Sequence, residues 1–119
     1  MTEARQKTGS LGEQIAWEYL AEKGYRLVER NHRCNWGEID IILEIEEFLV
    51  FCEVKTRRGL SGPHPSLSVT SRKKRKLRQL GERYLSQRHL THKQPRFDVI
   101  AVQLVGEKPP IIEHIINAF

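Results

Sequence analysis

Two acidic residues and a lysine lie on neighbouring extended segments, with a spacing that could place them in one metal-dependent site. Asp40 belongs to GEIDII, and Glu53 and Lys55 belong to FCEVKT, which follows it along the chain. Successive side chains of a strand point to opposite faces, so Glu53 and Lys55 share a face. Carboxylate oxygens are the ligands that Mg²⁺ and Mn²⁺ prefer. The pattern predicts two metal ligands with an ammonium group beside them.

A tight turn at positions 46 and 47 would pair the two segments as an antiparallel hairpin. In that register Asp40 is opposite Glu53, and Glu38 is opposite Lys55. Opposed side chains lie about 5 Å apart, where two carboxylates repel by about 3 kcal/mol at an effective dielectric of 20. A divalent cation, a protonated carboxylate or Lys55 itself could offset this repulsion. A solvated hairpin face with an ordinary Glu38–Lys55 ion pair is the simpler alternative.

The elements that must position these residues can be read from hydrophobic spacing and turn residues. Ser10 and Glu13 fit an S-x-x-E capping box before a helix over 11–23, and Gly24 supplies a stop. A second helix is predicted over 71–88, where Gly81 weakens it modestly. Strands are predicted at 25–31, 38–45, 48–56 and 96–105, and the last segment, 111–119, is a strand or a short helix.

The strand over 38–45 alternates, so one of its faces is expected in the core and the other is mixed. The core face is expected to carry Ile39, Ile41, Leu43 and Ile45. The chain shows no internal repeat or linker. We therefore expect a flexible segment over 1–9 and a single domain over 10–119, a length that suits one hydrophobic core.

The charge balance favours a polyanionic partner. The 119 residues carry a formal net charge of +5, which suits nucleic acid or an acidic membrane surface. No apolar run approaches the roughly 20 residues of a membrane span, and the first residues lack the apolar centre of a signal peptide. We expect a cytoplasmic protein that does not enter a membrane. Cys34 and Cys52 are interpreted as reduced thiols, because a zinc site that uses them with His32 lacks a fourth ligand.

Six of the seven residues in RKKRKLR, at 72–78, are basic, and no acid interrupts the run. Such a run is often a solvated helix face, but the lack of acidic partners favours phosphate binding. The candidate contacts to a nucleic acid backbone are Arg57, Arg58, Lys73, Lys74 and Lys76. Lys73 and Lys74 should point sideways or inward, while Arg72, Arg75 and Arg78 face water.

Contacts to phosphates position a nucleic acid without reading its sequence, so structure-selective binding is expected. Trp17 and Trp36 could stack on bases, but their amphipathic placement favours packing in the core or at its rim. An interaction protein whose basic helix binds an acidic protein partner is a further possibility.

GEIDII followed by EVKTR resembles the YraN-like family of small bacterial proteins, also called UPF0102. This family is similar to the PD-(D/E)xK, or restriction-endonuclease-like, nuclease superfamily and related to archaeal Holliday junction resolvases. The resemblance extends over nearly the whole chain through GSLGEQIAWEYLAEKGY, ERNHRCNWGEIDII, VFCEVKTR, SVTSRKK and RFDVIAV. It implies an α/β fold with an α-β-β-β-α-β core, in which helices flank a mixed central sheet.

The resemblance also implies roles for single residues. Asp40 takes the place of the metal-binding Asp, Glu53 that of the second acidic ligand, and Lys55 that of the superfamily's lysine. Glu13 matches the acid on the helix of the resolvase-like branch, although the capping box also accounts for it. Lys73 matches a lysine that recurs in the family. For Glu38 a structural role is favoured, and Asp98 is expected to pair with Arg96 or another basic side chain.

Together these features predict a nuclease that uses Mg²⁺ or Mn²⁺ to hydrolyse phosphodiester bonds in DNA, with a resolvase-like preference for substrate structure. Its metal ligands would be Asp40, Glu53 and Glu13, with Lys55 as a further catalytic residue. A homodimer, as in related resolvases, is left open. The alternative is a non-catalytic protein that binds nucleic acid on the same scaffold, because a fold does not by itself establish an activity.

Overall fold

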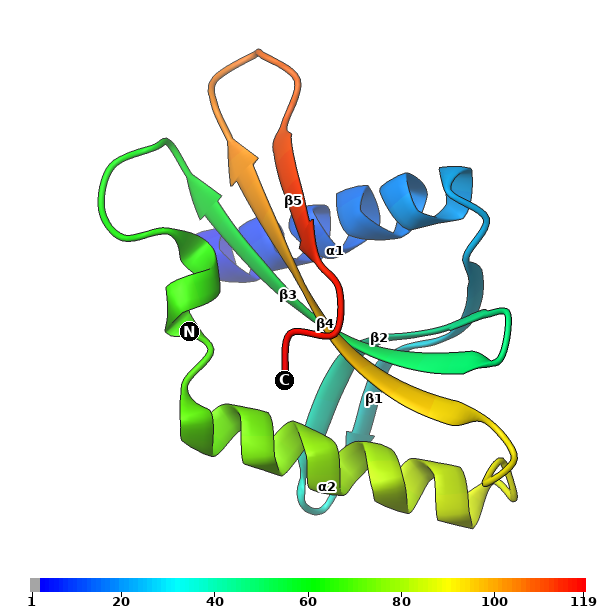
Figure 1. Ribbon diagram of the computed structural model, residues 1–119. Coiled ribbons are helices and arrows are strands. Elements are labelled where there is room, and N and C mark those ends of the chain that lie inside the picture. The colour runs from blue at the N-terminus through cyan, green and yellow to red at the C-terminus, as the bar shows by residue number, and fades with distance from the viewer. Residues whose placement is uncertain (1–2) are drawn as a thin grey trace.

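The computed structural model describes residues 3–119 and shows a five-stranded sheet with a long helix on each face (Figure 1). The elements are α1 (Glu3–Glu22), β1 (Arg26–Cys34), β2 (Gly37–Ile45), β3 (Phe48–Arg58), the short 3₁₀ helix η1 (Pro65–Ser68), α2 (Ser71–Gln87), β4 (Gln94–Leu104) and β5 (Ile111–Ile115). The strands lie in chain order; β3 and β4 are parallel, and the other neighbours are antiparallel.

This arrangement confirms the predicted fold class. The order is α-β-β-β-α-β-β, consistent with a restriction-endonuclease-like core, and α2 makes the crossover between the parallel strands β3 and β4. The last segment forms the strand β5, which settles the alternative left open above. None of the helices within residues 3–119 is long and apolar enough to cross a membrane.

The first helix begins at Glu3, so the predicted start at residue 11 is wrong. Ser10 lies inside α1 and cannot cap it. The first turns of α1 are polar and lack the apolar periodicity on which the prediction relied. Residues 3–9 of the segment expected to be flexible are therefore helical, whereas Met1 and Thr2 lie outside the described residues. The flexibility of 1–9 stays a prediction.

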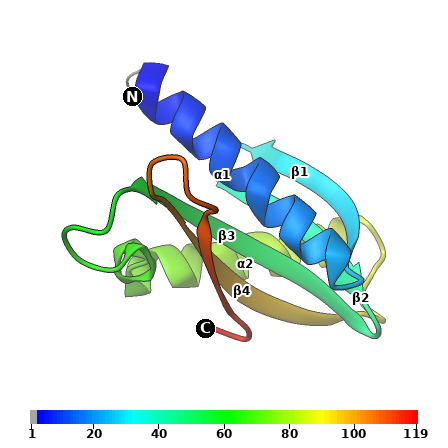
Figure 2. The same cartoon turned by 90° about the horizontal axis from the view of Figure 1, so that it is seen from above.

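Each face of the sheet carries its own apolar layer, because the central strands are covered by a helix on both sides (Figure 2). The layer under α1 consists of Ala16, Leu20, Tyr25, Ile41, Leu43, Val50, Cys52, Val54, Ile100 and Val102. The layer under α2 consists of Ile39, Ile42, Leu49, Phe51, Leu77, Leu80, Tyr84, Leu85 and Phe97. Ile39 and Ile41 thus pack on opposite faces, although strict alternation predicted a common one. The strand changes orientation at Asp40, between them.

The hairpin of β2 and β3 keeps the predicted register only in part. Ile45 pairs with Phe48, and the ladder continues to Ile41 opposite Cys52, where it ends. Beyond this point β2 remains paired with β1, and β3 remains paired with β4, so that the two strands diverge (Figure 1). We call this point the fork. The backbone pairs predicted between Asp40 and Glu53 and between Glu38 and Lys55 are therefore absent from the ladder.

The ion pair predicted between Glu38 and Lys55 is replaced by two others. The Glu38 carboxylate lies 3.2 Å from Nε of Arg33, and Nζ of Lys55 lies 3.5 Å from Oε1 of Glu53. The correction follows from the fork, because Arg33 is the β1 residue directly opposite Glu38. Because β2 and β3 diverge here, the Lys55 side chain pairs with Glu53 on its own strand instead.

Asp98, on β4, is fully buried in a polar network and confirms the predicted ion pair with Arg96. The guanidinium donates to both carboxylate oxygens, at 3.1 and 2.8 Å. His114 Nε2 lies 2.7 Å from Oδ2, and the backbone N–H of Asn117 donates to Oδ1 at 2.9 Å. Burial raises the pKa of Asp98, but these hydrogen bonds outweigh it and hold the pKa below its usual range. This carboxylate links β4 to β5 and to the chain that follows.

Gly12 lets α1 lie very close to β3. A Cβ atom at this position would stand 1.8 Å from Oγ1 of Thr56, far inside van der Waals contact. Glycine is therefore required by space, despite its low helix propensity. The close approach fixes the height of the next residue, Glu13, above the sheet.

We predict that Gly12→Ala destabilises the protein by about 1–3 kcal/mol, the usual range for overpacking, because α1 must move away from β3. Gly9→Ala is the matched control in the same helix, since a Cβ there meets nothing within 4 Å. It should be neutral or stabilise by up to about 1 kcal/mol through helix propensity. Urea unfolding measures both changes. The same sign and size for the two variants would contradict the close approach.

Candidate active site

Asp40 lies at the fork and replaces the missing strand pairing with its side chain. Its Oδ2 accepts a hydrogen bond from the backbone N–H of Val54 at 2.9 Å. A buried N–H without a partner is costly, and the ladder no longer offers Val54 a carbonyl of β2. Asp40 is only 9% exposed, so its carboxylate is held in a fixed position where the two strands separate.

Glu53 is the most buried acid of the site, with 4% exposure, and two lysines from different elements reach it. Nζ of Lys55, on β3, lies 3.5 Å from Oε1, and Nζ of Lys73, on α2, lies 3.6 Å from the same oxygen. The structure thus brings the predicted residues Glu53, Lys55 and Lys73 together. The two ammonium groups supply the positive charge that a buried carboxylate needs.

Burial and neighbouring acids raise the pKa of two carboxyl groups of the site. Burial first, and then the charge of Glu53, raise the pKa of Asp40 to about 7, although the Val54 hydrogen bond opposes the shift. Burial also raises the pKa of Glu13, against the opposing charge of Arg30. The charge of Glu13 contributes to the raised pKa of Asp40, so the helix acid belongs to the same cluster. We call Glu13, Glu38, Asp40 and Glu53 the acidic cluster.

The chemistry of the donor set fits a hard divalent cation. All the acidic groups offer oxygen ligands, and Mg²⁺ binds through one or two carboxylates while keeping several waters. Asp40 and Glu53 could supply that pair, with Glu13 on the α1 side. Within residues 3–119, however, no three His, Cys, Asp or Glu side chains stand close enough to hold a metal as they are arranged. Tighter coordination by all three predicted ligands would require their side chains to turn.

The predicted nucleic-acid contacts divide into two groups. Lys73 and Lys74 are half-buried, whereas Arg72, Arg75 and Arg78 are exposed, as predicted from the helical spacing. Among the other predicted contacts, Lys76 is exposed and lies on the outer face of α2. Lys73 alone reaches the acidic cluster. Nζ of Lys74 instead lies 6.0 Å from the ring centroid of Phe119.

Arg57 and Arg58 are the last residues of β3, and their contacts differ from those of the basic residues of α2. The guanidinium of Arg57 donates to the carbonyls of residues 60–63 and to Gln103, so it holds the loop after β3. Arg58 donates through Nε to Oγ1 of Thr8 at 3.0 Å. Both arginines, with Glu13 and Lys55, line a groove of about 630 Å³ between α1 and β3. Contact with a nucleic acid is a proposal for both.

Two residues of the site escaped the sequence reasoning. The charge of Arg30 opposes the rise in the pKa of Glu13, and its guanidinium donates to Oε1 of Gln14 at 2.7 Å, which links β1 to α1. Thr70 caps α2, because its Oγ1 accepts from the N–H of Lys73 at 3.2 Å. Thr directly before a predicted helix is a signal that could have located this cap. Nothing in the sequence pattern singled out Arg30.

The chain is similar to a group of curated bacterial proteins of one family. The model of the uncharacterised protein family UPF0102 matches residues 12–102. A UPF0102 protein of Pelobacter propionicus is 49% identical over 114 residues, 94% of this chain and 81% of the relative. One of Caldanaerobacter subterraneus is 41% identical over 122 residues and spans 100% of both chains. One of Rhodococcus opacus is 40% identical over 111 residues, 93% of this chain and 94% of the relative. The names of these relatives state no activity.

We predict that Asp40→Asn stabilises the metal-free protein at pH 8. A pKa raised from 3.8 to about 7 means that the folded state disfavours the carboxylate, so stability is lost as the pH rises through this window. At 1.36 kcal/mol per unit, the variant should gain up to about 4 kcal/mol at pH 8 and much less at pH 5, and an asparagine oxygen can still accept from Val54. Urea unfolding with a chelator measures both values. A loss of stability at pH 8 would contradict the repulsion.

Proposed function

The chain belongs to the uncharacterised protein family UPF0102, and we propose that it is a metal-dependent nuclease that hydrolyses phosphodiester bonds in DNA. The observation that carries the proposal is the acidic cluster at the fork, where buried Asp40 and Glu53 stand beside the ammonium groups of Lys55 and Lys73. A buried acid whose pKa is raised by burial and by a neighbouring acid, next to fixed cations, is typical of catalytic sites. A purely structural ion pair would need only one acid.

In the proposed site Asp40 and Glu53 would hold Mg²⁺ or Mn²⁺, and Glu13 would be a further ligand from α1. Such a cation would supply a Lewis acid for the phosphate and lower the pKa of a water molecule. Lys55 would orient the attacking water or stabilise the charge that develops on the phosphate. Lys73, which shares the Glu53 oxygen with Lys55, would bind a neighbouring phosphate oxygen.

The surrounding charge supports a nucleic acid as substrate. Lys73 of α2 reaches the acidic cluster, and Arg57 and Arg58 line a groove together with Glu13 and Lys55. Phosphate contacts of this kind hold a strand in place without reading bases, so selection by shape is proposed. A homodimer that presents two such sites to a branched substrate is compatible with this proposal.

A non-catalytic nucleic-acid-binding protein is the second candidate. One observation favours it: Glu53 already has two ammonium partners, and no three acids of the described residues converge as a preformed metal site. Lysines that satisfy the carboxylate permanently would leave a positively charged binding surface without hydrolysis. The two candidates differ in whether divalent cations bind at Asp40 and whether DNA is cut.

We predict that the wild type cleaves branched or flapped DNA with Mg²⁺ or Mn²⁺, and that Asp40→Asn and Glu53→Gln each lower the rate by more than about 100-fold, since even outer partners of metal ligands are worth 10- to 100-fold. Gel assays of branched, flapped and linear DNA measure the rates. Glu47→Gln, at an exposed turn, is the charge-matched control and should cleave normally. Equal rates in all variants would reject these roles. Salt-sensitive binding without any cleavage would favour the second candidate.

We predict that Mg²⁺ or Mn²⁺ raises the melting temperature of the wild type but not that of Asp40→Asn or Glu53→Gln. At 100 times the dissociation constant, binding to the native state adds about 2.7 kcal/mol, a shift of several degrees for a small domain. Differential scanning fluorimetry over a cation titration measures the shift. The Glu47→Gln control should respond as the wild type does. An equal response in Asp40→Asn would place the cation elsewhere.

A further inference from the structure

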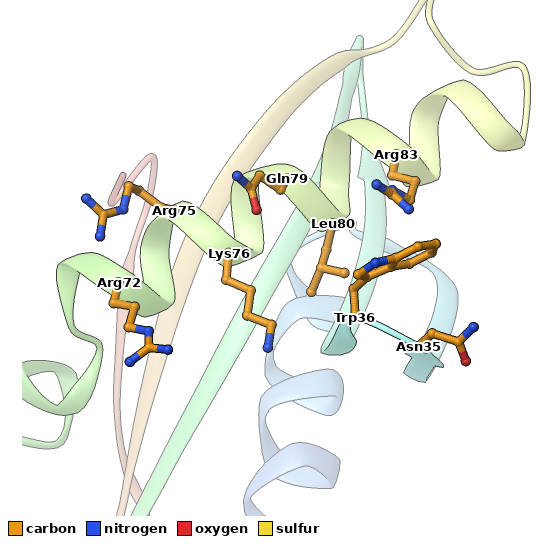
Figure 3. A pocket seen from close by; sticks show the side chains of 8 residues that line it. All are labelled: Asn35, Trp36, Arg72, Arg75, Lys76, Gln79, Leu80 and Arg83. Carbon is orange, nitrogen blue, oxygen red and sulfur yellow. The ribbon is translucent and has the colours of Figure 1, made fainter.

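A second concave site lies outside the acidic cluster, between the turn joining β1 to β2 and the outer face of α2 (Figure 3). Its volume is about 480 Å³, within the range of small-ligand sites. We call it the tryptophan pocket; it is lined by Asn35, Trp36, Arg72, Arg75, Lys76, Gln79, Leu80 and Arg83. None of the roles proposed above for the acids explains it.

The lining combines an exposed aromatic ring with positive charge. Trp36 is 52% exposed, among the most exposed large apolar side chains of the described residues. The guanidinium of Arg83 lies over its indole ring, 3.6 Å from the centroid. Four lining residues are basic and none is acidic, so the pocket attracts anions. The exposure overturns the expectation that Trp36 packs in the core or at its rim.

The pocket adjoins the acidic cluster through two connections. Lys76 lines the pocket, and Lys73, three residues earlier on α2, reaches Glu53. Residues three apart on a helix are neighbours on its surface. Trp36 directly precedes β2 and stands four residues before Asp40, a separation of at most about 13 Å along the chain. A nucleic acid strand bound near Asp40 could therefore reach Trp36 within a few nucleotides.

The turn lies close to α2 at this point. Gly37 has a φ of 145°, and a Cβ there would lie 3.1 Å from Cε of Lys76 and 3.3 Å from Cδ1 of Leu80. Glycine at position 37 thus lets the turn approach the helix closely. This approach places Trp36 beside the basic side chains of the helix.

We infer that the tryptophan pocket binds an unpaired nucleotide of the nucleic acid, with its base stacked on Trp36 and adjacent phosphates paired with Arg72, Arg75 and Lys76. Every base has a face that can stack on an aromatic ring, and guanidinium planes such as that of Arg83 stack on bases as well. This inference rests on the proposed function and names its substrate class: nucleic acid with a single-stranded portion beside the cleaved bond.

Two other occupants fit the lining less well. An intact duplex hides its base faces between neighbouring pairs, so it would use the basic residues but place no base against the exposed part of the indole. An acidic peptide would likewise satisfy the charges without requiring an exposed ring. The combination of an indole, a stacked guanidinium and three further cations matches a base with its flanking phosphates.

The first test measures binding without catalysis. Labelled oligonucleotides of 20 thymidines, of 20 uridines, and a blunt duplex are titrated by fluorescence anisotropy in a chelator, so that no cleavage step enters. We expect Trp36→Ala to weaken binding of both single strands about tenfold or more, the cost of losing one stacked base, and to leave duplex binding nearly unchanged. Trp36→Phe should restore most of the affinity. The two single strands distinguish DNA from RNA as the source of the nucleotide.

Matched controls separate stacking from charge. Arg75→Gln, in the pocket, should weaken single-strand binding more than Arg78→Gln, on the same helix but outside the pocket lining. In the Trp17→Phe background Trp36 is the sole tryptophan, and its fluorescence should be quenched by the single strands. This readout needs no alteration of the pocket.

Several results would overturn the inference. These are unchanged single-strand affinity in Trp36→Ala, an equal loss for duplex, absence of quenching, or competition by polyglutamate as strong as by the oligonucleotide. The last result would assign the surface to an acidic protein partner. Because the assay contains no divalent cation, failure here leaves the cleavage assay of Asp40→Asn unaffected. Conversely, a chain that never cleaves DNA can still pass or fail this test.

Discussion

The end of backbone pairing between β2 and β3 is the constraint on which the candidate site depends. Where the ladder stops at Ile41 and Cys52, each strand stays paired only with its other neighbour, and the sheet opens. The N–H of Val54 then needs an acceptor, and the Asp40 carboxylate supplies it at 2.9 Å. Beyond this point Ile39 packs in the layer under α2, whereas Ile41 packs in the layer under α1. A continuous hairpin would have set Asp40 directly opposite Glu53.

The two buried aspartates, Asp98 and Asp40, have pKa values shifted in opposite directions because their hydrogen-bond partners and neighbouring charges differ. Burial raises the pKa of both, but Asp98 receives hydrogen bonds from Arg96, His114 and the N–H of Asn117, and its pKa falls below the usual range. Asp40 has the single Val54 donor, and with other acids nearby its pKa rises to about 7. Asp98 therefore stabilises the C-terminal half as an ion. The ionised form of Asp40 destabilises the folded protein, and burial of the two apolar layers must offset that cost. Such a cost is characteristic of functional positions.

Helix α2 connects the acidic cluster with the surface that would hold the substrate. Its inner apolar residues cover one face of the sheet, and Lys73, beside them, reaches Glu53. Its outer residues line a pocket with Trp36, which directly precedes β2 (Figure 3). A run of cations at a helix N-terminus is unfavourable for an isolated helix, and bound anions would relieve it.

The sequence alone determined the order of the elements, because apolar periodicity is a local property, and the spacing of GEIDII and EVKTR located the acids of the candidate site. The mixed sheet was expected only from the resemblance to a known family. The sequence also determined the register near the turn, from Ile45 to Ile41. Only the tertiary structure decided where that register ends, that Lys73 shares Glu53 with Lys55, and that Trp36 is exposed beside Arg83. At the fork each hairpin strand stays paired with its outer neighbour, and such pairing with distant partners leaves no mark in a local pattern. The first turns of α1 were missed because they are polar and lack apolar periodicity.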